Sequence, residues 1–228
     1  MENKTIEFVC TANNGRSTIS RAIAQAYLVR QGLDQLYGSI SSGSHTNQVL
    51  AGNMPVSIKK MVIESGLRDG ICTPQELAEL VSKYSLDEIE KRRNEDPIYK
   101  VSFDSVAERC RQHYSKVEEI ECREVAHELG IEQHLDGNFK QTRARTDVVA
   151  VMTMGASNLK AVQGIYRAAG QNPIMEILPR YVLGQEAAEV PNAFSKGKAS
   201  YMIVVEQLRE LVPKAIEKTV NEIETAQR

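Results

Sequence analysis

A cysteine, an arginine and a serine lie close together near the start of the chain, at Cys10, Arg16 and Ser17. A short apolar run, residues 6–9, precedes the cysteine, and a helix-like segment follows the serine. A loop that closes between a strand and a helix N-terminus directs backbone N–H groups into one concavity, which binds an anion. Arg16 could add a two-pronged fork to two oxygens of a tetrahedral oxyanion. The segment therefore predicts a site that holds a phosphate-like anion against a thiol.

The same features favour the thiolate form of Cys10, because helix N-termini and nearby cations stabilise a negative sulfur. Ser17 has two possible roles, either capping the helix or donating a hydrogen bond to the cysteine sulfur. Asn13 and Gly15 are residue types that tolerate the left-handed backbone that a tight loop needs. The alternative is that Cys10 is an inert, small hydrophobe at the end of a strand.

Strands and helices alternate along the parts of the chain that surround this segment. The sequence predicts short strands at residues 5–9, 39–42, 147–152 and 174–178. It predicts helices over 17–30, from Pro55 to Gly66, over 157–169, and from about 199 onward with a kink or break at Pro213. This alternation is typical of an α/β fold, a three-layer sandwich with a parallel sheet of about four strands. Ligands bind at the carboxyl ends of such strands, where Cys10 lies.

Residues 69–138 differ from the rest because they are highly charged and mostly helical in pattern. Thr73-Pro74-Gln75-Glu76 has the signature of a helix start with a capping box. We expect one domain over residues 1–228 with an inserted helical subdomain at about 69–138.

Composition excludes several classes of protein. The net charge of −2 gives no case for nucleic acid or an acidic membrane surface, and no apolar run has membrane-spanning length. Residues 1–10 lack the apolar core of a signal peptide, so we expect a cytoplasmic protein. The cysteines are too widely spaced for a zinc site or a disulfide scaffold: Cys10, Cys72, Cys110 and Cys122.

Residues 5–30 resemble the opening of the low-molecular-weight protein tyrosine phosphatases and the related arsenate reductases. Ser41-Ser42-Gly43-Ser44 is similar to the family's S-A-G-T turn, and residues 146–159 resemble its penultimate core strand and the helix after it. The insertion has no counterpart that we identify in the family.

The resemblance implies a phosphomonoesterase in which Cys10 attacks phosphorus to give a cysteinyl-phosphate. Arg16 would clamp the transition state, and Ser17 would stabilise the departing thiolate. Asn13 matches the asparagine that holds the family's loop. The substrate would be a phosphorylated small molecule or a phosphotyrosine protein, with no metal or organic cofactor. The backbone amides of the loop would bind the phosphoryl oxygens: Thr11, Ala12, Asn13, Asn14, Gly15 and Arg16.

The chain departs from the family at the general acid, the group that protonates the leaving oxygen. The family has an aspartate before its last helix, whereas this chain has Asn192, whose amide cannot act as an acid. Glu189 or Glu186 could serve instead. Asp96, in the sequence Asp96-Pro97-Ile98-Tyr99, could serve if the insertion folds back over the site. Otherwise acid catalysis is absent and the enzyme is slow.

Two other functions compete with a phosphatase. A thiol-coupled arsenate reductase would need two resolving cysteines close together, and Cys110 and Cys122 are the candidates. A catalytically weak module that binds phosphate or a phosphopeptide would explain Asn192. Among the four histidines, His45 lies in a loop that the resemblance places near the site, where it either contacts substrate or has only a structural role.

Overall fold

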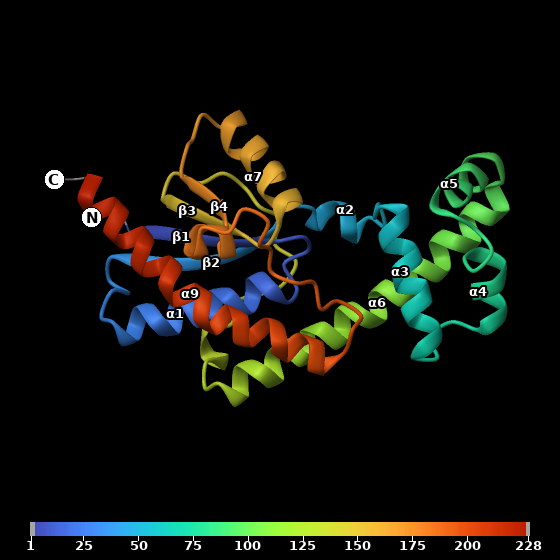
Figure 1. Cartoon of the computed structure of the whole chain (residues 1–228), viewed down its shortest axis with the longest axis horizontal. Coiled ribbons are helices and arrows are strands. Elements are labelled where there is room, and N and C mark those ends of the chain that lie inside the picture. The colour runs from blue at the N-terminus through green and yellow to red at the C-terminus, as the bar shows by residue number, and fades with distance from the viewer. Residues whose placement is uncertain (1–2, 227–228) are drawn as a thin grey trace. The chain divides into compact units, whose positions relative to one another are not determined.

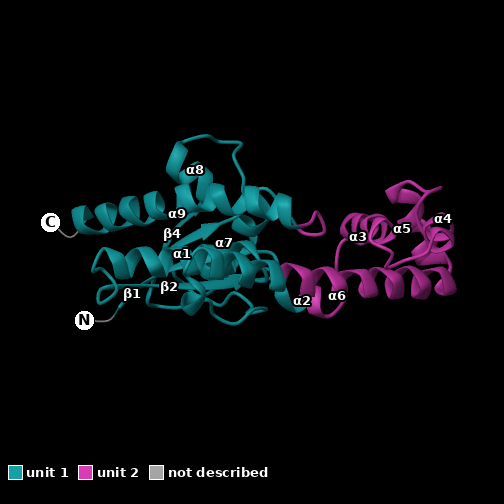
Figure 2. Cartoon of the chain, turned by 90° about the horizontal axis from the view of Figure 1, so that it is seen from below, with its two compact units in different colours: residues 1–47, 119–193, 198–228 teal, residues 48–118, 194–197 magenta. Residues whose placement is uncertain are grey.

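The computed structural model describes residues 3–226, and the chain forms two compact units within it (Figure 2). Unit 1 comprises residues 1–47, 119–193 and 198–228, of which the first two and last two lie outside the described residues. Unit 2 comprises residues 48–118 and 194–197. The chain therefore leaves unit 1 and returns to it twice.

Unit 1 is built on a four-stranded sheet in the order β2-β1-β3-β4. All neighbouring strands are parallel, as the sequence predicts. The strands are β1 (Lys4–Cys10), β2 (Tyr37–Gly43), β3 (Val148–Thr153) and β4 (Ile174–Ile177). In the register of β1 with β2, Cys10 pairs with Gly43. Cys10 is thus the last residue of β1, an inner strand, and it lies at the carboxyl edge of the sheet.

Helices cover both faces of this sheet (Figure 1). On one face lie α1 (Arg16–Arg30) and α9 (Lys198–Ala226), whose apolar side chains share one core with Phe8 and Met152. On the other face lies α7 (Ala156–Ala168). Its Val162 and Tyr166 pack in a separate cluster with Val9 and Val151. Because successive strand residues point to opposite faces, the apolar residues of β1 and β3 contribute to both layers. The predicted three-layer α/β sandwich is confirmed.

Three further elements complete unit 1. The short helix α8 (Leu178–Leu183) packs its Tyr181 in the core that contains α9. The last part of α6 (Pro97–Glu128) and the 3₁₀ turn η1 (Glu132–His134) lead back to the sheet. Helix α9 continues through Pro213 as a single element, so the predicted break at this proline is wrong. No helix in the described part of the chain is long and apolar enough to span a membrane.

Unit 2 is a helical subdomain with its own hydrophobic core, which includes Ile63, Ile89 and Phe103. Helices α4 and α5 each begin with a complete capping box, at Thr73 with Glu76 and at Ser85 with Glu88. The first capping box confirms the helix start that the sequence predicts. The helices are α2 (Thr46–Leu50), which begins in unit 1, then α3 (Val56–Arg68), α4 (Pro74–Leu80), α5 (Leu86–Glu95) and the first part of α6.

The bounds of unit 2 differ from the predicted insertion at 69–138. Helix α3 belongs to unit 2 because its Val62 and Ile63 pack in that unit's core. The stretch from Glu119 onward belongs to unit 1 because Cys122 and Val125 pack in the core beneath the sheet. The predicted bounds were based on charged residues, which lie on the helix surfaces. The unit to which each helix belongs is decided instead by its apolar contacts.

Asp147, just before β3, joins the starts of two strands. Its carboxylate accepts hydrogen bonds from Arg145 Nε (2.9 Å) and Nη2 (2.8 Å), and from Thr5 Oγ1 (2.8 Å). The hydrogen bonds from Arg145 are the largest cause that lowers the pKa of Asp147, from its ordinary value of 3.8 to about 2. A carboxyl group whose pKa is depressed by folding stabilises the fold above its unfolded pKa and loses that contribution as the pH falls.

We therefore expect Asp147→Asn to lower the free energy of unfolding most at neutral pH. The difference in unfolding free energy between the variant and the wild type should shrink as the pH falls from about 4 toward 2. Over this range the Asp147 carboxylate of the wild type becomes protonated, and so it becomes neutral like the amide of the variant. Urea unfolding followed by circular dichroism at several pH values measures this. A deficit of constant size across that range would show that the carboxylate charge is not responsible.

Candidate active site

The sulfur of Cys10 lies within a small set of hydrogen-bond donors. The backbone N–H of Asn13 donates to Sγ at 3.2 Å, and Ser17 Oγ lies 3.0 Å from Sγ. Asn13 Nδ2 donates to the same Ser17 hydroxyl at 3.1 Å. A deprotonated sulfur can only accept hydrogen bonds, so the Ser17 hydroxyl would donate to it. The Asn13 N–H and the Ser17 hydroxyl are thus two donors within reach of a thiolate at Cys10.

The structure thus resolves the two possible roles of Ser17. Helix α1 begins at Arg16 with Gly15 at its N-cap, and no side chain caps it. The first intrahelical hydrogen bond is Ile19 N–H to Gly15 O, so the N–H groups of Arg16, Ser17 and Thr18 have no carbonyl partner within the helix. Ser17 is therefore directed to the sulfur, and the first turn of α1 presents donors to an anion.

Asn13 gives the loop its shape. It adopts the left-handed region with φ of 56°, which is uncommon for a residue with a side chain. Both of its oxygens accept hydrogen bonds from a segment far along the chain, Oδ1 from the N–H of Lys140 (3.0 Å) and the carbonyl oxygen from the N–H of Phe139 (2.9 Å). Phe139 is left-handed as well, with φ of 58°. Gly15, by contrast, has φ of −128° and needs no such freedom.

A turn after β2 supports the other side of the loop. The N–H of Ser44 donates to Cys10 O and the N–H of His45 donates to Thr11 O, both at 2.9 Å. The buried amide of Asn158, in α7, donates to Ser44 Oγ at 2.9 Å and to Thr11 Oγ1 at 3.3 Å. The loop is therefore held by β2 and α7 in addition to the segment at Phe139.

Gly43 allows this close approach. A Cβ atom at this position would lie 2.2 Å from Thr46 Oγ1, 2.8 Å from Ala12 C and 2.8 Å from Asn13 N. Two of these three contacts are with the backbone of the loop itself, which cannot rotate away. The glycine in the S-S-G-S turn is thus required by packing against residues 12–13.

Arg16 brings the loop together with the segment in which the sequence places the general acid. Its Nη1 donates to Val190 O at 2.9 Å. Val190 and Ala193 are buried, whereas Asn192 between them is exposed. The N–H of Val190 donates to Met154 O, just after β3, at 2.9 Å. Val190 therefore lies against the loop, and Asn192 follows it two residues later on the same segment.

The other residues of the loop differ in burial. Asn14 and Gly15 are buried, Ala12 is half-buried, and Thr11 is exposed. Thr11 is thus at the rim of the loop, next to the turn that contains His45.

Two of the three carboxylates proposed as acids are engaged in capping helices. Glu189 Oε1 accepts a hydrogen bond from the N–H of Ala156 at 2.7 Å, which caps the start of α7. Asp96 Oδ1 accepts from the N–H groups of Ile98 and Tyr99 at 3.0 Å each, which caps α6 in unit 2. Glu186 is exposed on the loop after α8.

The two cysteines predicted to form a resolving pair for arsenate reduction, Cys110 and Cys122, are not close together. Cys110 and Cys122 both lie on α6, and twelve residues along a helix correspond to about 18 Å. Cys110 is buried in unit 2, where its thiol hydrogen-bonds with that of Cys72. Burial raises the pKa of Cys110 to about 12, which keeps it a thiol. Cys122 is buried in the core of unit 1.

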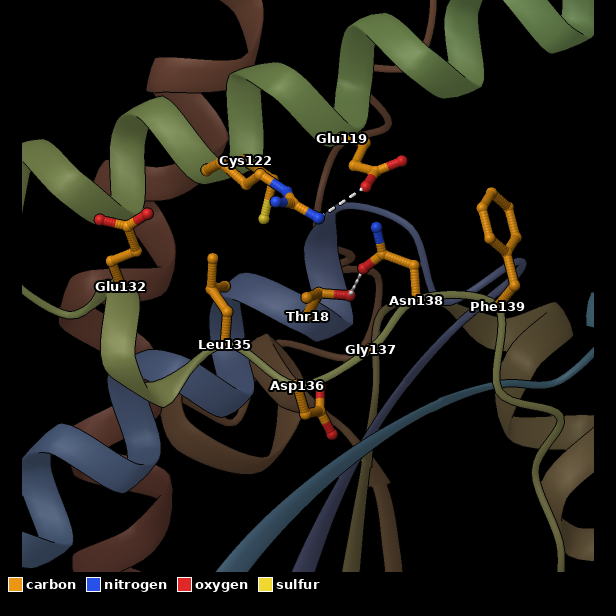
Figure 3. Close-up of a pocket in the computed structure, with 10 residues that line it drawn as sticks. Thr18, Glu119, Cys122, Glu132, Leu135, Asp136, Gly137, Asn138 and Phe139 are labelled. Atoms are coloured by element: carbon orange, nitrogen blue, oxygen red, sulfur yellow. Dashed lines mark hydrogen bonds and ion pairs between the residues drawn. The ribbon is translucent and has the colours of Figure 1, made fainter.

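A cavity of about 530 Å³ lies beside the loop and is connected to it through Thr18 (Figure 3). Thr18 Oγ1 donates to Asn138 Oδ1 at 3.4 Å and accepts from Asn13 Nδ2 at 3.5 Å. Cys10 does not line this cavity, and its carboxylates, Glu119, Glu132 and Asp136, would repel a phosphoryl dianion. We therefore place the anion at the loop and not in the cavity. Within residues 3–226, no three His, Cys, Asp or Glu side chains gather to hold a metal ion.

Sequence reasoning missed three contributors to the site: Asn158, the main chain of Phe139 and Lys140, and the main chain of Val190. The last two act through backbone groups, which no side-chain pattern identifies. The sequence does contain one indication of Asn158, since it is a polar residue in the first turn of a helix that follows a buried strand.

The chain matches no protein-family model. No curated protein matches it in sequence either. Solved structures do match, however. A low-molecular-weight protein tyrosine phosphatase from T. tengcongensis aligns with a TM-score of 0.52 and 18% identity, over 95% of this chain and 99% of that chain. One from Bacillus subtilis aligns with a TM-score of 0.53 and 16% identity, over 96% and 97%. Wzb from Vibrio vulnificus, in complex with benzylphosphonate, aligns with a TM-score of 0.51 and 11% identity, over 95% and 99%. The chain therefore has the fold of the low-molecular-weight protein tyrosine phosphatases.

The close contacts around Gly43 lead to a first prediction about the site. We expect Gly43→Ala to displace the loop and to weaken the binding of orthovanadate by at least about tenfold, a loss of about 1.4 kcal/mol. Gly38→Ala is the matched control, because it lies on the same strand and nothing lies within 4 Å of the position that a Cβ would take. Isothermal titration calorimetry measures both affinities. Equal affinities in the two variants would show that the loop tolerates the clash.

Asn13 makes a second prediction. Asn13→Ala removes the acceptor of the Lys140 N–H and leaves a residue with a Cβ at positive φ, whereas Asn13→Gly removes the acceptor without that strain. We expect both variants to be destabilised, and Asn13→Ala by about 1 kcal/mol more than Asn13→Gly, the cost of the left-handed conformation. Denaturant unfolding measures the two values. If Asn13→Gly proved the less stable variant, backbone strain would not be the reason for the asparagine.

Proposed function

We propose that the chain is a cysteine-dependent phosphomonoesterase that acts through a cysteinyl-phosphate on Cys10. The observation that carries this proposal is the pair of donors directed at Cys10 Sγ, from the Asn13 N–H and the Ser17 hydroxyl, at the N-terminus of α1. The fold is also that of structures described as phosphatases, one with a phosphonate ligand and one, an arginine phosphatase, with a phosphorylated active-site serine. The substrate class is a phosphorylated small molecule or a phosphotyrosine protein.

The geometry suggests how the first step would proceed. The thiolate of Cys10, stabilised by its two donors, attacks phosphorus, and the bond from phosphorus to the leaving oxygen breaks. The loop amides of residues 11–16 and the Arg16 guanidinium hold the three remaining oxygens, whose charge grows in the transition state. The hydrogen bond from Arg16 to Val190 O fixes the guanidinium at the loop before substrate binds.

In the second step water attacks the phosphorus of the cysteinyl-phosphate, and the P–S bond breaks. The sulfur leaves as a thiolate, so any group that stabilises its negative charge accelerates this step. Ser17 is placed to do so because its Oγ lies 3.0 Å from Sγ, where the hydroxyl donates to the sulfur once that is negative. Asn13 keeps that hydroxyl oriented, which couples the shape of the loop to the leaving ability of the sulfur.

The two rival functions are less well supported. Thiol-coupled arsenate reduction needs a close pair of resolving cysteines, whereas Cys110 and Cys122 lie more than three helical turns apart. A module that only binds phosphate would have no use for the donors directed at the sulfur, although Asn192 is consistent with slow turnover.

The proposal predicts the behaviour of two variants toward 4-nitrophenyl phosphate. Cys10→Ser should abolish turnover while orthovanadate or phosphate still binds, because the loop and Arg16 remain. Arg16→Lys keeps the charge but loses the planar fork, and we expect kcat to fall by at least about 100-fold, the loss of a well-placed transition-state donor. Steady-state kinetics and calorimetry measure these effects.

Inorganic phosphate released by the wild type and lost in Cys10→Ser would support the phosphatase. No release by the wild type, with vanadate still bound, would select the binding module. Thiol consumption that depends on arsenate would select the reductase.

A further inference from the structure

We infer that His45 is the general acid of the reaction, the group that protonates the leaving oxygen as Cys10 attacks phosphorus. This inference rests on the proposed phosphatase function. The need for such a group follows from Asn192, whose amide has no acidic proton to give, and from Glu189, whose carboxylate caps α7. An imidazole is the side chain best suited to give and take a proton near neutral pH.

The backbone places His45 at the rim of the anion loop. Its N–H donates to Thr11 O at 2.9 Å. The N–H of the residue before it, Ser44, donates to Cys10 O. These two bonds fix the turn after β2 against the first two residues of the loop. Thr11 is exposed and His45 is half-buried, so this turn is at the solvent-facing rim of the loop.

The contact at Nδ1 of His45 leaves the other ring nitrogen, Nε2, for proton transfer. His45 Nδ1 lies 2.7 Å from Ser44 Oγ. That hydroxyl also accepts a hydrogen bond from Asn158 Nδ2 (2.9 Å) and donates to Cys10 O (3.3 Å). One hydroxyl proton and two lone pairs are thus matched when Nδ1 carries a proton and donates to Ser44. In the imidazolium form the second proton is on Nε2, which this contact leaves available.

The proton transfer balances in both steps. When Sγ attacks, the bond from phosphorus to the leaving oxygen breaks, and the proton on His45 Nε2 moves to that oxygen, which leaves as an alcohol or phenol. The ring is then neutral, and Nε2 accepts a proton from the water that attacks the cysteinyl-phosphate. The P–S bond breaks, Sγ leaves as a thiolate, and the imidazolium is restored.

A histidine that only braces the turn would have the same contact with Ser44, so the test must separate the two roles. Dependence on the leaving group does so, because a general acid matters most when the leaving oxygen is basic. Phenyl phosphate has a poor leaving group, and 4-nitrophenyl phosphate has a good one. His45→Asn keeps an amide near the position of Nδ1, and His45→Gln places one near Nε2. Both variants lack the acidic proton.

We expect kcat of both variants to fall by about 100-fold or more with phenyl phosphate, and by less than about tenfold with 4-nitrophenyl phosphate. Affinity for orthovanadate should stay within about twofold of wild type, which reports an intact loop. His127→Gln, an exposed histidine of unit 1 on α6, is the control and should match the wild type with both substrates.

Equal losses with the two substrates, or no loss, would overturn the assignment, and so would the same selective loss in Glu189→Gln but not in the His45 variants. Loss of vanadate binding in both His45 variants would also overturn it, since His45 would then be a brace of the loop. These results are distinct from failure of the proposed function, in which the wild type itself hydrolyses neither substrate.

Discussion

The conformation of Asn13 is the constraint on which the site depends. A left-handed residue with a side chain costs about 1 kcal/mol, so the loop persists in this shape only because other parts of the chain hold it. The N–H groups of Phe139 and Lys140 hold both oxygens of Asn13, while its side-chain nitrogen orients Ser17. The shape of the loop backbone and the position of the Ser17 hydroxyl beside the sulfur thus depend on a single residue.

The same site is assembled from elements that converge on one edge of the sheet. β1 delivers Cys10, the turn after β2 delivers Ser44 and His45, and the start of α7 delivers Asn158. The segment at Val190 completes it through the carbonyl that Arg16 contacts. Parallel strands end together at one edge of the sheet. The segments that follow them therefore each contact the loop after β1, and the loop itself stays short. Unit 2 has its own core and its own helix caps, and its residues 48–118 run from within α2 to within α6.

Sequence alone predicted the sheet, because its strands are apolar and its helices have one apolar face, and it predicted the loop, because strand, cysteine, arginine and helix occur in order. Asn13 was assigned correctly to the left-handed region by residue type, whereas Gly15 was not. The bounds of unit 2 could not be predicted, since α3 and the end of α6 are distinguished only by the core that their apolar residues enter. The supports of the loop at Phe139, Lys140 and Val190 act through main-chain groups and leave no trace in the sequence.

The distance along the chain between the loop and its supports has a consequence for synthesis. Because synthesis proceeds from the N-terminus, Cys10 and Arg16 are made well before the groups that hold their loop, since the hydrogen bonds join residues 127 and 174 positions apart. A nascent chain that ends before residue 140 therefore carries Cys10 without these supports. Because non-local contacts of this kind form late in folding, the loop reaches its final shape only after residue 190 has been added.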